Sequence, residues 1–390
     1  MGFSLKTLLS SGLRAVFGRA AGTLSLRGPA SSAADRLLVD AIRLAELASP
    51  APGEEPRATF TLERLKSFGL IPEVDGTGSI LVRLHSEQAA DEAPVLLFTD
   101  LGSKRWHPTE SLARLDADTA SGAGLSDSLG TAALLSIAEN YSTGAFQIPR
   151  DILLLFTAKS LDDPNNSFDP ILRSSENRPF AAIGVRGLSL DRVIHSVGSY
   201  RLRVTVSGDT DQTSNKVTET LIDTARTILG IAWDSEGKTK VFIRRIEAAT
   251  VYGLTPEEGL LEIEIESTEA NLLELAMNAV KATAGKTGEA AGLKSETALL
   301  SFIPAGKPEK SLELFEIVRK HAREQRIKLR EENGADPSSF FTSGDIPALS
   351  LGMALGREGI DRDIINIDSL EKGRRILERL ISEAGGRSGF

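Results

Sequence analysis

The chain has 390 residues, enough for two domains with separate cores, and 41% of them are hydrophobic and 25% charged, as in ordinary globular proteins. A net charge of −9, with no segment that concentrates Lys and Arg, argues against nucleic acid as the main partner, and no apolar stretch is long enough to span a membrane. The absence of cysteine excludes disulfides, thiolate metal sites and a cysteine nucleophile, and only four histidines are available for a metal site.

Residues 1–34 contain no acidic residue but carry four basic ones, Lys6, Arg14, Arg19 and Arg27, among Leu, Ala, Ser and Gly. This composition is typical either of a loosely attached N-terminal extension or of an amphipathic targeting or membrane-surface helix. We favour the extension and expect a cytoplasmic protein, because assigning a targeting segment requires knowledge of the organism.

Helices and strands alternate along the next part of the chain. Apolar residues recur at helical spacing from Asp35 until prolines intervene at positions 50 and 52. Further helices are predicted at 55–68 and 131–141, and strands at 79–84, 94–99 and 151–158. The last two strands are apolar runs that suit a buried sheet. The alternation predicts an α/β domain with a mixed, largely parallel sheet flanked by helices.

A change of pattern near residue 199 predicts a second domain. Its elements, in the order β-α-β-β-α-β, are predicted at 200–206, 215–229, 240–246, 261–267, 269–284 and 298–302. After Pro304 the α/β pattern resumes, with helices at 309–324 and 369–383. We therefore predict an α/β domain of residues 35–198 and 306–390, interrupted by an inserted α+β, ferredoxin-like domain of residues 199–305.

The segment from Gly122 to Gly130 has the pattern Gly-x-Gly-x-x-Asp-x-x-Gly at the head of an apolar helical run. Such a loop presents one carboxylate, that of Asp127, at the start of a helix. Two interpretations are open, since Asp127 is placed either to bind a ligand or simply to cap the helix that begins near Ser128.

This loop, the domain order and the position of the insertion resemble the co-catalytic zinc exopeptidases and deacylases, which include tripeptidase T, carboxypeptidase G, aminoacylase and acetylornithine deacetylase. The resemblance runs from about Asp35 to the C-terminus. It implies a zinc-exopeptidase-like fold with an inserted lid or dimerisation domain, a homodimer, and a peptide or N-acyl amino acid as ligand. In this family two zinc ions hold a water that attacks an amide carbonyl, and a glutamate shuttles the proton.

The family's ligand positions can be followed residue by residue. Asp127 stands at the carboxylate that bridges the two metals. The first motif, His-x-Asp after a strand, has Asp100 at the histidine and Gly102 at the orienting aspartate. The acid that precedes the inserted domain corresponds to His195. The resemblance therefore implies a residual site for one divalent metal, such as zinc, formed by Asp100, Asp127 and His195, although His195 can also be read as a histidine satisfied at a strand end.

Other functional positions of the family carry residues that cannot do the same chemistry. The paired glutamates, base and then ligand, correspond to Ser160 and Leu161, and the C-terminal histidine ligand corresponds to Gly359. In the inserted domain, a histidine that reaches across the dimer corresponds to Gln212, and an arginine that grips a substrate carboxylate corresponds to Glu266. One substrate-loop acid persists as Asp336.

A shift in alignment would change part of this assignment. A two-residue shift places Asp162 and Asp163 at the paired acids, although the following Pro and Asn residues favour a solvated turn. Acids near the C-terminal position, and a histidine near the first motif, offer further alternatives: Glu358, Asp361, Asp363 and His107.

Two functions remain open. The first is a catalytically impaired or inactive relative, kept for binding or assembly, because the base, two ligands, the orienting aspartate, the cross-dimer histidine and the carboxylate-gripping arginine are all replaced. The second is a metal-dependent hydrolase of peptide or N-acyl amide bonds with a single or altered metal site. We favour the first, since the replacements fall together on one site.

Overall fold

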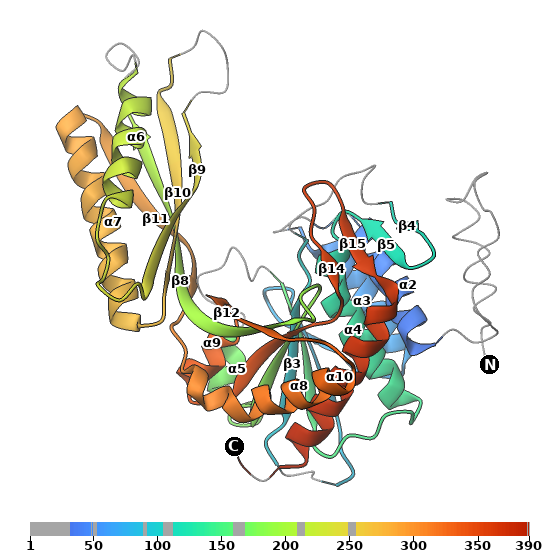
Figure 1. Cartoon of the computed structure of the whole chain (residues 1–390). Helices are drawn as coiled ribbons and strands as arrows, with labels where there is room; N and C mark the ends of the chain where they lie inside the picture. The colour runs from blue at the N-terminus through green and yellow to red at the C-terminus, as the bar shows by residue number, and fades with distance from the viewer. Residues whose placement is uncertain are drawn as a thin grey trace, which may run out of the picture.

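The computed structural model describes residues 32–47, 49, 53–88, 92–103, 112–158, 168–208, 215–248, 255–387 and 389 (Figure 1). The predicted N-terminal extension therefore lies, up to residue 31, outside the described residues. Within the described part of the chain, no helix combines the length and apolar character needed to cross a membrane.

A six-stranded sheet forms the centre of the larger part of the molecule. In spatial order, the last four strands run parallel to one another, and each of the first two is antiparallel to its neighbours. Most positions of the parallel strands are buried, because helices and loops cover both faces. In spatial order the strands are β1 (Glu73–Val74), β2 (Ile80–Leu84), β6 (Ile152–Thr157), β3 (Val95–Asp100), β7 (Ala181–Arg186) and β13 (Ala348–Gly352). This confirms the predicted mixed, largely parallel sheet.

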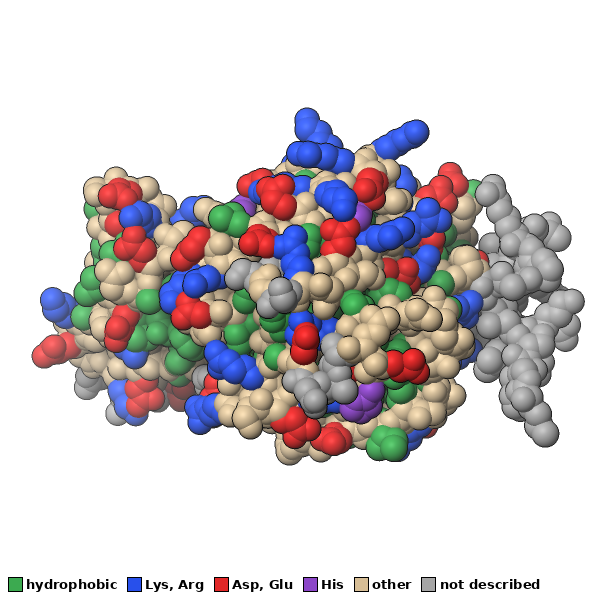
Figure 2. Space-filling model, turned by 90° about the horizontal axis from the view of Figure 1, so that it is seen from below, with side chains coloured by type: hydrophobic (Ala, Val, Ile, Leu, Met, Phe, Trp, Pro, Cys, Tyr) green, Lys and Arg blue, Asp and Glu red, His purple; other side chains and the backbone are tan. Residues whose placement is uncertain are grey.

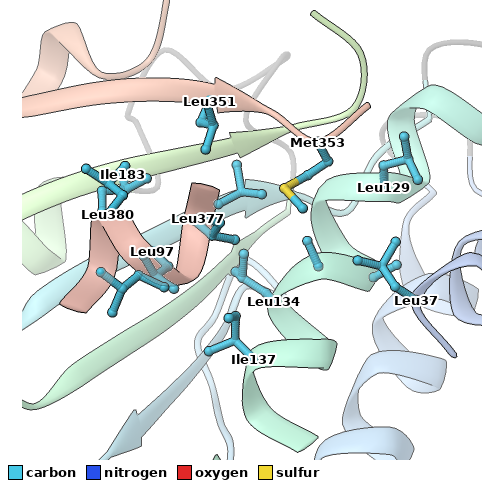
Figure 3. Packing of buried hydrophobic residues seen from close by; sticks show 14 of the residues in the cluster. Leu37, Leu97, Leu129, Leu134, Ile137, Ile183, Leu351, Met353, Leu377 and Leu380 are labelled. Carbon is cyan, nitrogen blue, oxygen red and sulfur yellow. The ribbon is translucent and has the colours of Figure 1, made fainter. Parts of the chain in front are cut away.

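Helices bury one face of this sheet in the main core. Figure 3 shows strand residues Leu97, Ile183 and Leu351 packed together with Leu134 and Leu377 from two covering helices. The opposite face carries a smaller aromatic cluster that includes Phe98, Phe168 and Phe341. The helices around the sheet are α2 (Ala33–Glu46), α3 (Glu55–Ser67), α4 (Leu125–Ser142), α5 (Asp169–Arg173), α8 (Leu312–Glu324), α9 (Ser339–Ser343) and α10 (Ile367–Gly385), with a short 3₁₀ turn η2 (Pro308–Ser311).

A four-stranded antiparallel sheet lies next to the start of α4. It brings a C-terminal hairpin beside the residues that lead into that helix, with Asp363 in register with Gly122. The strands, in spatial order, are β14 (Gly356–Arg357), β15 (Asp363–Asn366), β5 (Thr119–Gly122) and β4 (Arg114–Leu115).

The inserted segment forms a separate antiparallel sheet with two helices on one face, at the upper left of Figure 1. In chain order its elements are β8 (Arg192–Ser207), α6 (Lys216–Leu229), β9 (Thr239–Glu247), β10 (Glu258–Ser267), α7 (Ala270–Ala291) and β11 (Lys294–Ile303). The β-α-β-β-α-β order is the one predicted from the sequence.

Strand β8 belongs to both parts of the molecule. Its first half pairs in parallel with β12 (Arg330–Ala335), and from Gly198 onward it pairs with β10 and β11. At the change of partners Gly198 lies so close to the returning chain that an added Cβ would be 2.6 Å from the backbone nitrogen of Ala305. The domain boundaries at 198/199 and 305/306 stay a prediction, which this crossing of the two connections supports.

Candidate functional site

A cleft of about 260 Å³ lies at the carboxyl ends of the parallel strands. Open α/β sheets bind ligands at this edge because the loops that follow the strands converge there. The wall on the side of the larger domain includes Asp100, Asp127 and Arg186, and the inserted domain contributes Arg201 and Phe302.

Asp100 is the last residue of β3 and lines the cleft. Its neighbour in register on β6 is Thr157, whose hydroxyl donates a hydrogen bond of 2.6 Å to the Asp100 carboxylate. Thr157 also donates to the carbonyl of Thr99, so the strand pair holds the hydroxyl in place.

Asp127 lies in the first turn of α4, which begins at Leu125, three residues before the start near Ser128 expected from the loop and six before the predicted helix of residues 131–141. Gly124 enters the helix with φ of 71°, a conformation that glycine adopts without strain. The start of the helix favours a carboxylate, because the free backbone N–H groups of the first turn give it partial positive charge. The hydroxyl of the buried Ser103 lies 3.3 Å from Asp127 Oδ2.

Arg57 lies fully buried beneath this turn. Its guanidinium donates to Ser128 Oγ at 2.9 Å and to the carbonyl of Leu44 at 2.9 Å, and makes longer contacts of 3.3–3.4 Å with the carbonyls of Leu101, Gly102 and Gly124. Burial lowers the pKa of Arg57 to about 10, while the negative charge of Asp127 acts in the opposite direction. Arg57 was missed in the sequence, although helical spacing places it on the same face as the buried Thr61 and Leu65.

His195 lies on the other side of β8 from the cleft. Ile194 lines the cleft, whereas the His195 ring packs 4.9 Å from the ring of Phe315 and its Nε2 lies 2.9 Å from Glu331 Oε2. Successive side chains of a strand point to opposite faces, so a single position decides which residue faces the cleft. The structure therefore brings Asp100 and Asp127 to the cleft but does not bring His195 to them.

The three predicted metal donors, Asp100, Asp127 and His195, do not come together at one point. Among the described residues, no group of three or more His, Asp or Glu side chains is placed to hold an ion. The charge of the buried Arg57 acts on Asp127, and positive charge opposes the entry of a divalent cation.

Asp336, predicted as a substrate-binding acid, lies behind the wall of the cleft and is fully buried. Its Oδ1 accepts hydrogen bonds of 2.8 Å from the Ser350 hydroxyl and from the backbone N–H of Ser338. Its Oδ2 lies 2.5 Å from Nη2 of Arg186, which lines the cleft with 38% of its side chain exposed. The structure thus places Asp336 as the partner of a cleft arginine that the sequence did not single out.

Two of the alternative acids, Glu358 and Asp363, lie at the start of α4, where Asp127 also lies. Glu358 lines the cleft, with Oε1 3.3 Å from the hydroxyl of Ser126, and the buried Asp363 accepts a 3.0 Å hydrogen bond from the Ser126 backbone. Gly359 lies in the tight β14–β15 connection, where an added Cβ would be 2.1 Å from the carbonyl of Arg362.

Several predicted positions cannot be placed. His107, Ser160, Leu161, Asp162, Asp163 and Gln212 lie outside the described residues. Glu266 is on β10, in register with the cleft residue Ser199. Burial, and then the neighbouring Glu264, raises the pKa of Glu266 above its usual range.

An α/β domain interrupted by an inserted α+β domain is an architecture also found in solved structures of peptidases and amidases. Neither family models nor curated protein sequences match this chain. Solved structures do: a tripeptidase from Staphylococcus aureus subsp. aureus Mu50 aligns with a TM-score of 0.66 at 13% identity, over 91% of this chain and 99% of that one. An amidase of the hydantoinase/carbamoylase family from Burkholderia vietnamiensis aligns with a TM-score of 0.65 at 12% identity, over 91% and 98%.

A third similar structure is a dinuclear metal-binding peptidase of the M20 family from Bacillus subtilis, with a TM-score of 0.59 at 11% identity, over 90% of this chain and 98% of that one. These similarities extend over nearly the whole of both chains, so they confirm the fold that the sequence resemblance implied. At such identities they establish a shared fold and leave the chemistry to the residues of the cleft.

Proposed function

We propose that this chain is a non-hydrolytic protein with the metallopeptidase and amidase fold, which uses the cleft to bind a small ligand such as a peptide or an N-acyl amino acid. The observation that carries the proposal is the replacement of the expected metal donors. Asp100 and Asp127 remain at the cleft with hydroxyl partners, while the third predicted donor, His195, pairs with Glu331 on the opposite face of β8.

Metal content and turnover, measured together, test this proposal. After zinc loading and gel filtration, we expect less than one tenth of an equivalent of metal per chain (~0.1) and no hydrolysis of a panel of dipeptides and N-acyl amino acids. Asp127→Ala is the comparison variant, since it removes the carboxylate that matches the bridging ligand. Stoichiometric metal with turnover that Asp127→Ala abolishes would overturn the proposal.

A metal-dependent amide hydrolase with an altered site is the second candidate. It is favoured by the presence of Asp100 and Asp127 on one cleft in a fold shared with a dinuclear metal-binding peptidase. In this case further ligands and the base would come from outside the described residues, such as His107, Asp162 or Asp163. The positive outcome of the same experiment, followed by Asp162→Ala and Asp163→Ala, would support it.

We further propose a homodimer that forms through the inserted domain. Exposed apolar side chains support it: Ile222 and Leu229 are seven residues apart on α6, hence on one helix face, and Leu275 on α7 is also exposed. On the face seen in Figure 2, acidic and basic side chains are interspersed, which favours a protein or small-molecule partner over nucleic acid. Sedimentation should show a dimer that Ile222→Glu with Leu229→Glu converts to a monomer, and a monomeric wild type would contradict the proposal.

A further inference from the structure

The charges of the cleft are divided between neighbouring strand ends. Asp100 ends β3 and Arg186 ends β7, two neighbouring parallel strands whose pairing runs to Phe98 and Gly184, and both residues line the cleft. Asp127 at the start of α4 lines the same cleft. The cleft therefore carries the carboxylates of Asp100 and Asp127, with Glu358 near the start of α4 as a third, together with the guanidinium of Arg186.

Arg186 is held from behind by a buried acid. Asp336 is fully buried, and its Oδ1 is fixed by the hydroxyl of Ser350 and the backbone N–H of Ser338. Its Oδ2 faces Nη2 of Arg186 at 2.5 Å. A guanidinium has five N–H donors in a planar fork, so a contact at one nitrogen leaves donors for a second carboxylate. With 38% of the side chain exposed at the cleft wall, these donors are accessible to a ligand.

The other cleft arginines are engaged differently. Arg192 pairs with the half-exposed Glu332, and Arg201 pairs with Glu264, which also binds Arg244. Neither lies at the end of a strand of the central parallel sheet, where ligands of such folds bind. Arg186 alone among these three combines that position with an ion pair to a fully buried acid.

We infer that Arg186 binds the carboxylate of a zwitterionic ligand, a free amino acid or a short peptide with an unblocked amino group, and that Asp100 and Asp127 receive its ammonium. A ligand with only an anionic group would be repelled by the two acids, and one with only a cationic group would be repelled by Arg186. A ligand that carries both charges satisfies both sides. Asp336 is a positioning residue, because it acts through Arg186. This inference rests on the proposed binding function and narrows its ligand to molecules with a free amino group, which excludes N-acyl amino acids.

Matched ligands provide the first test. The probes are L-alanyl-L-leucine, its C-terminal amide and its N-acetyl derivative, with binding measured by calorimetry on the full chain. Charge-assisted hydrogen bonds contribute enough for us to expect about tenfold or greater loss of affinity when either charge is removed from the dipeptide. Equal affinity for the dipeptide and its amide would overturn the role of Arg186.

Matched variants provide the second test. Arg186→Gln should lose the preference for the dipeptide over its amide, and it should bind the amide at least as tightly as the wild type does, because the repelling cation is gone. Asp336→Asn should reduce the same preference, and Arg192→Gln should keep it, with unfolding midpoints measured for each variant. If Arg192→Gln lowers the affinity for the dipeptide as much as Arg186→Gln does, the ligand is attracted by the overall positive charge of the cleft, and the inference is wrong.

A generic zwitterion separates this inference from the proposed function. L-leucine tested with wild type and Arg186→Gln shows whether Arg186 selects carboxylates when the peptide probes fail to bind. If L-leucine binds and this binding requires Arg186, the inference about Arg186 holds. The peptide is then rejected as the ligand. Probe binding that Arg186→Gln leaves unchanged would overturn the inference and keep the binding function, and no binding of any probe to the wild type would overturn both.

Discussion

The guanidinium of Arg57 on α3 donates a 2.9 Å hydrogen bond to the hydroxyl of Ser128 on α4, and Ser128 in turn donates at 2.7 Å to the carbonyl of Gly124. The same guanidinium contacts the carbonyls of Leu101 and Gly102, directly after β3. One buried cation thus connects the two segments that carry Asp100 and Asp127, and its charge lies near the carboxylate of Asp127.

Arg57→Leu should lower the free energy of unfolding by about 3–5 kcal/mol, because it leaves a buried hydroxyl and several buried carbonyls without their donor. Urea denaturation measures the change. Arg173→Ala is the control, since Arg173 is 81% exposed and its ion pair with Asp169 connects successive turns of a short helix. We expect about 0.5 kcal/mol or less there. A loss for Arg57→Leu no larger than that of the control would show that the guanidinium does not stabilise the turn.

The close packing of α4 on the sheet gives a second prediction. A Cβ at Gly130 would lie 2.2 Å from the hydroxyl of Thr99 and 2.4 Å from the carbonyl of Val185, so Gly130→Ala must displace the helix and should cost about 1–3 kcal/mol. Gly285 is also inside a helix but has open space around it, so Gly285→Ala should stabilise by about 0.5–1 kcal/mol. Thermal unfolding measures the change in stability of each variant relative to the wild type. Changes of the same sign in the two variants would contradict the packing explanation.

The pairing of His195 with Glu331 predicts a pH dependence. Hydrogen bonds from His195 and then from Arg319 lower the pKa of Glu331 below its usual value of about 4. A depressed carboxylate pKa means that the unfolded chain binds more protons, so this contribution to stability is present above about pH 4 and is lost as pH falls through the folded-state pKa.

Glu331→Gln should therefore flatten the acid side of the curve of urea midpoint against pH, while the exposed Glu87→Gln should leave the slope unchanged. Carbon-detected NMR titration of Glu331 would give the pKa directly. A value at or above the usual one would contradict the hydrogen bonding described for this pair.

The fold and the cleft acids Asp100 and Asp127 could be predicted from the sequence, whereas most of the rest of the cleft could not, for identifiable reasons. Apolar periodicity and the Gly122–Gly130 loop locate β3, α4 and Asp127, because these depend on local pattern. The side of β8 that faces the cleft depends on tertiary register, and a one-residue difference separates Ile194 from His195. Arg186 has no local signal, since its partner Asp336 is 150 positions away in the chain.

Zinc should fail to stabilise the protein. A metal that binds only the folded chain raises stability by RT ln(1 + [metal]/Kd), which is about 2.7 kcal/mol at a hundredfold excess over Kd. With the charge of Arg57 acting on Asp127 and Arg186 lining the same cleft as Asp100, we expect the unfolding midpoint with added zinc to equal that with chelator. Asp127→Ala and His195→Ala, measured in both conditions, assign any rise that does occur. A rise lost in Asp127→Ala but kept in His195→Ala would mean that donors outside the described residues complete a metal site, which is the hydrolase alternative. A rise lost in both variants would restore the three-residue site predicted from the sequence, and would require His195 to leave Glu331 and cross to the cleft.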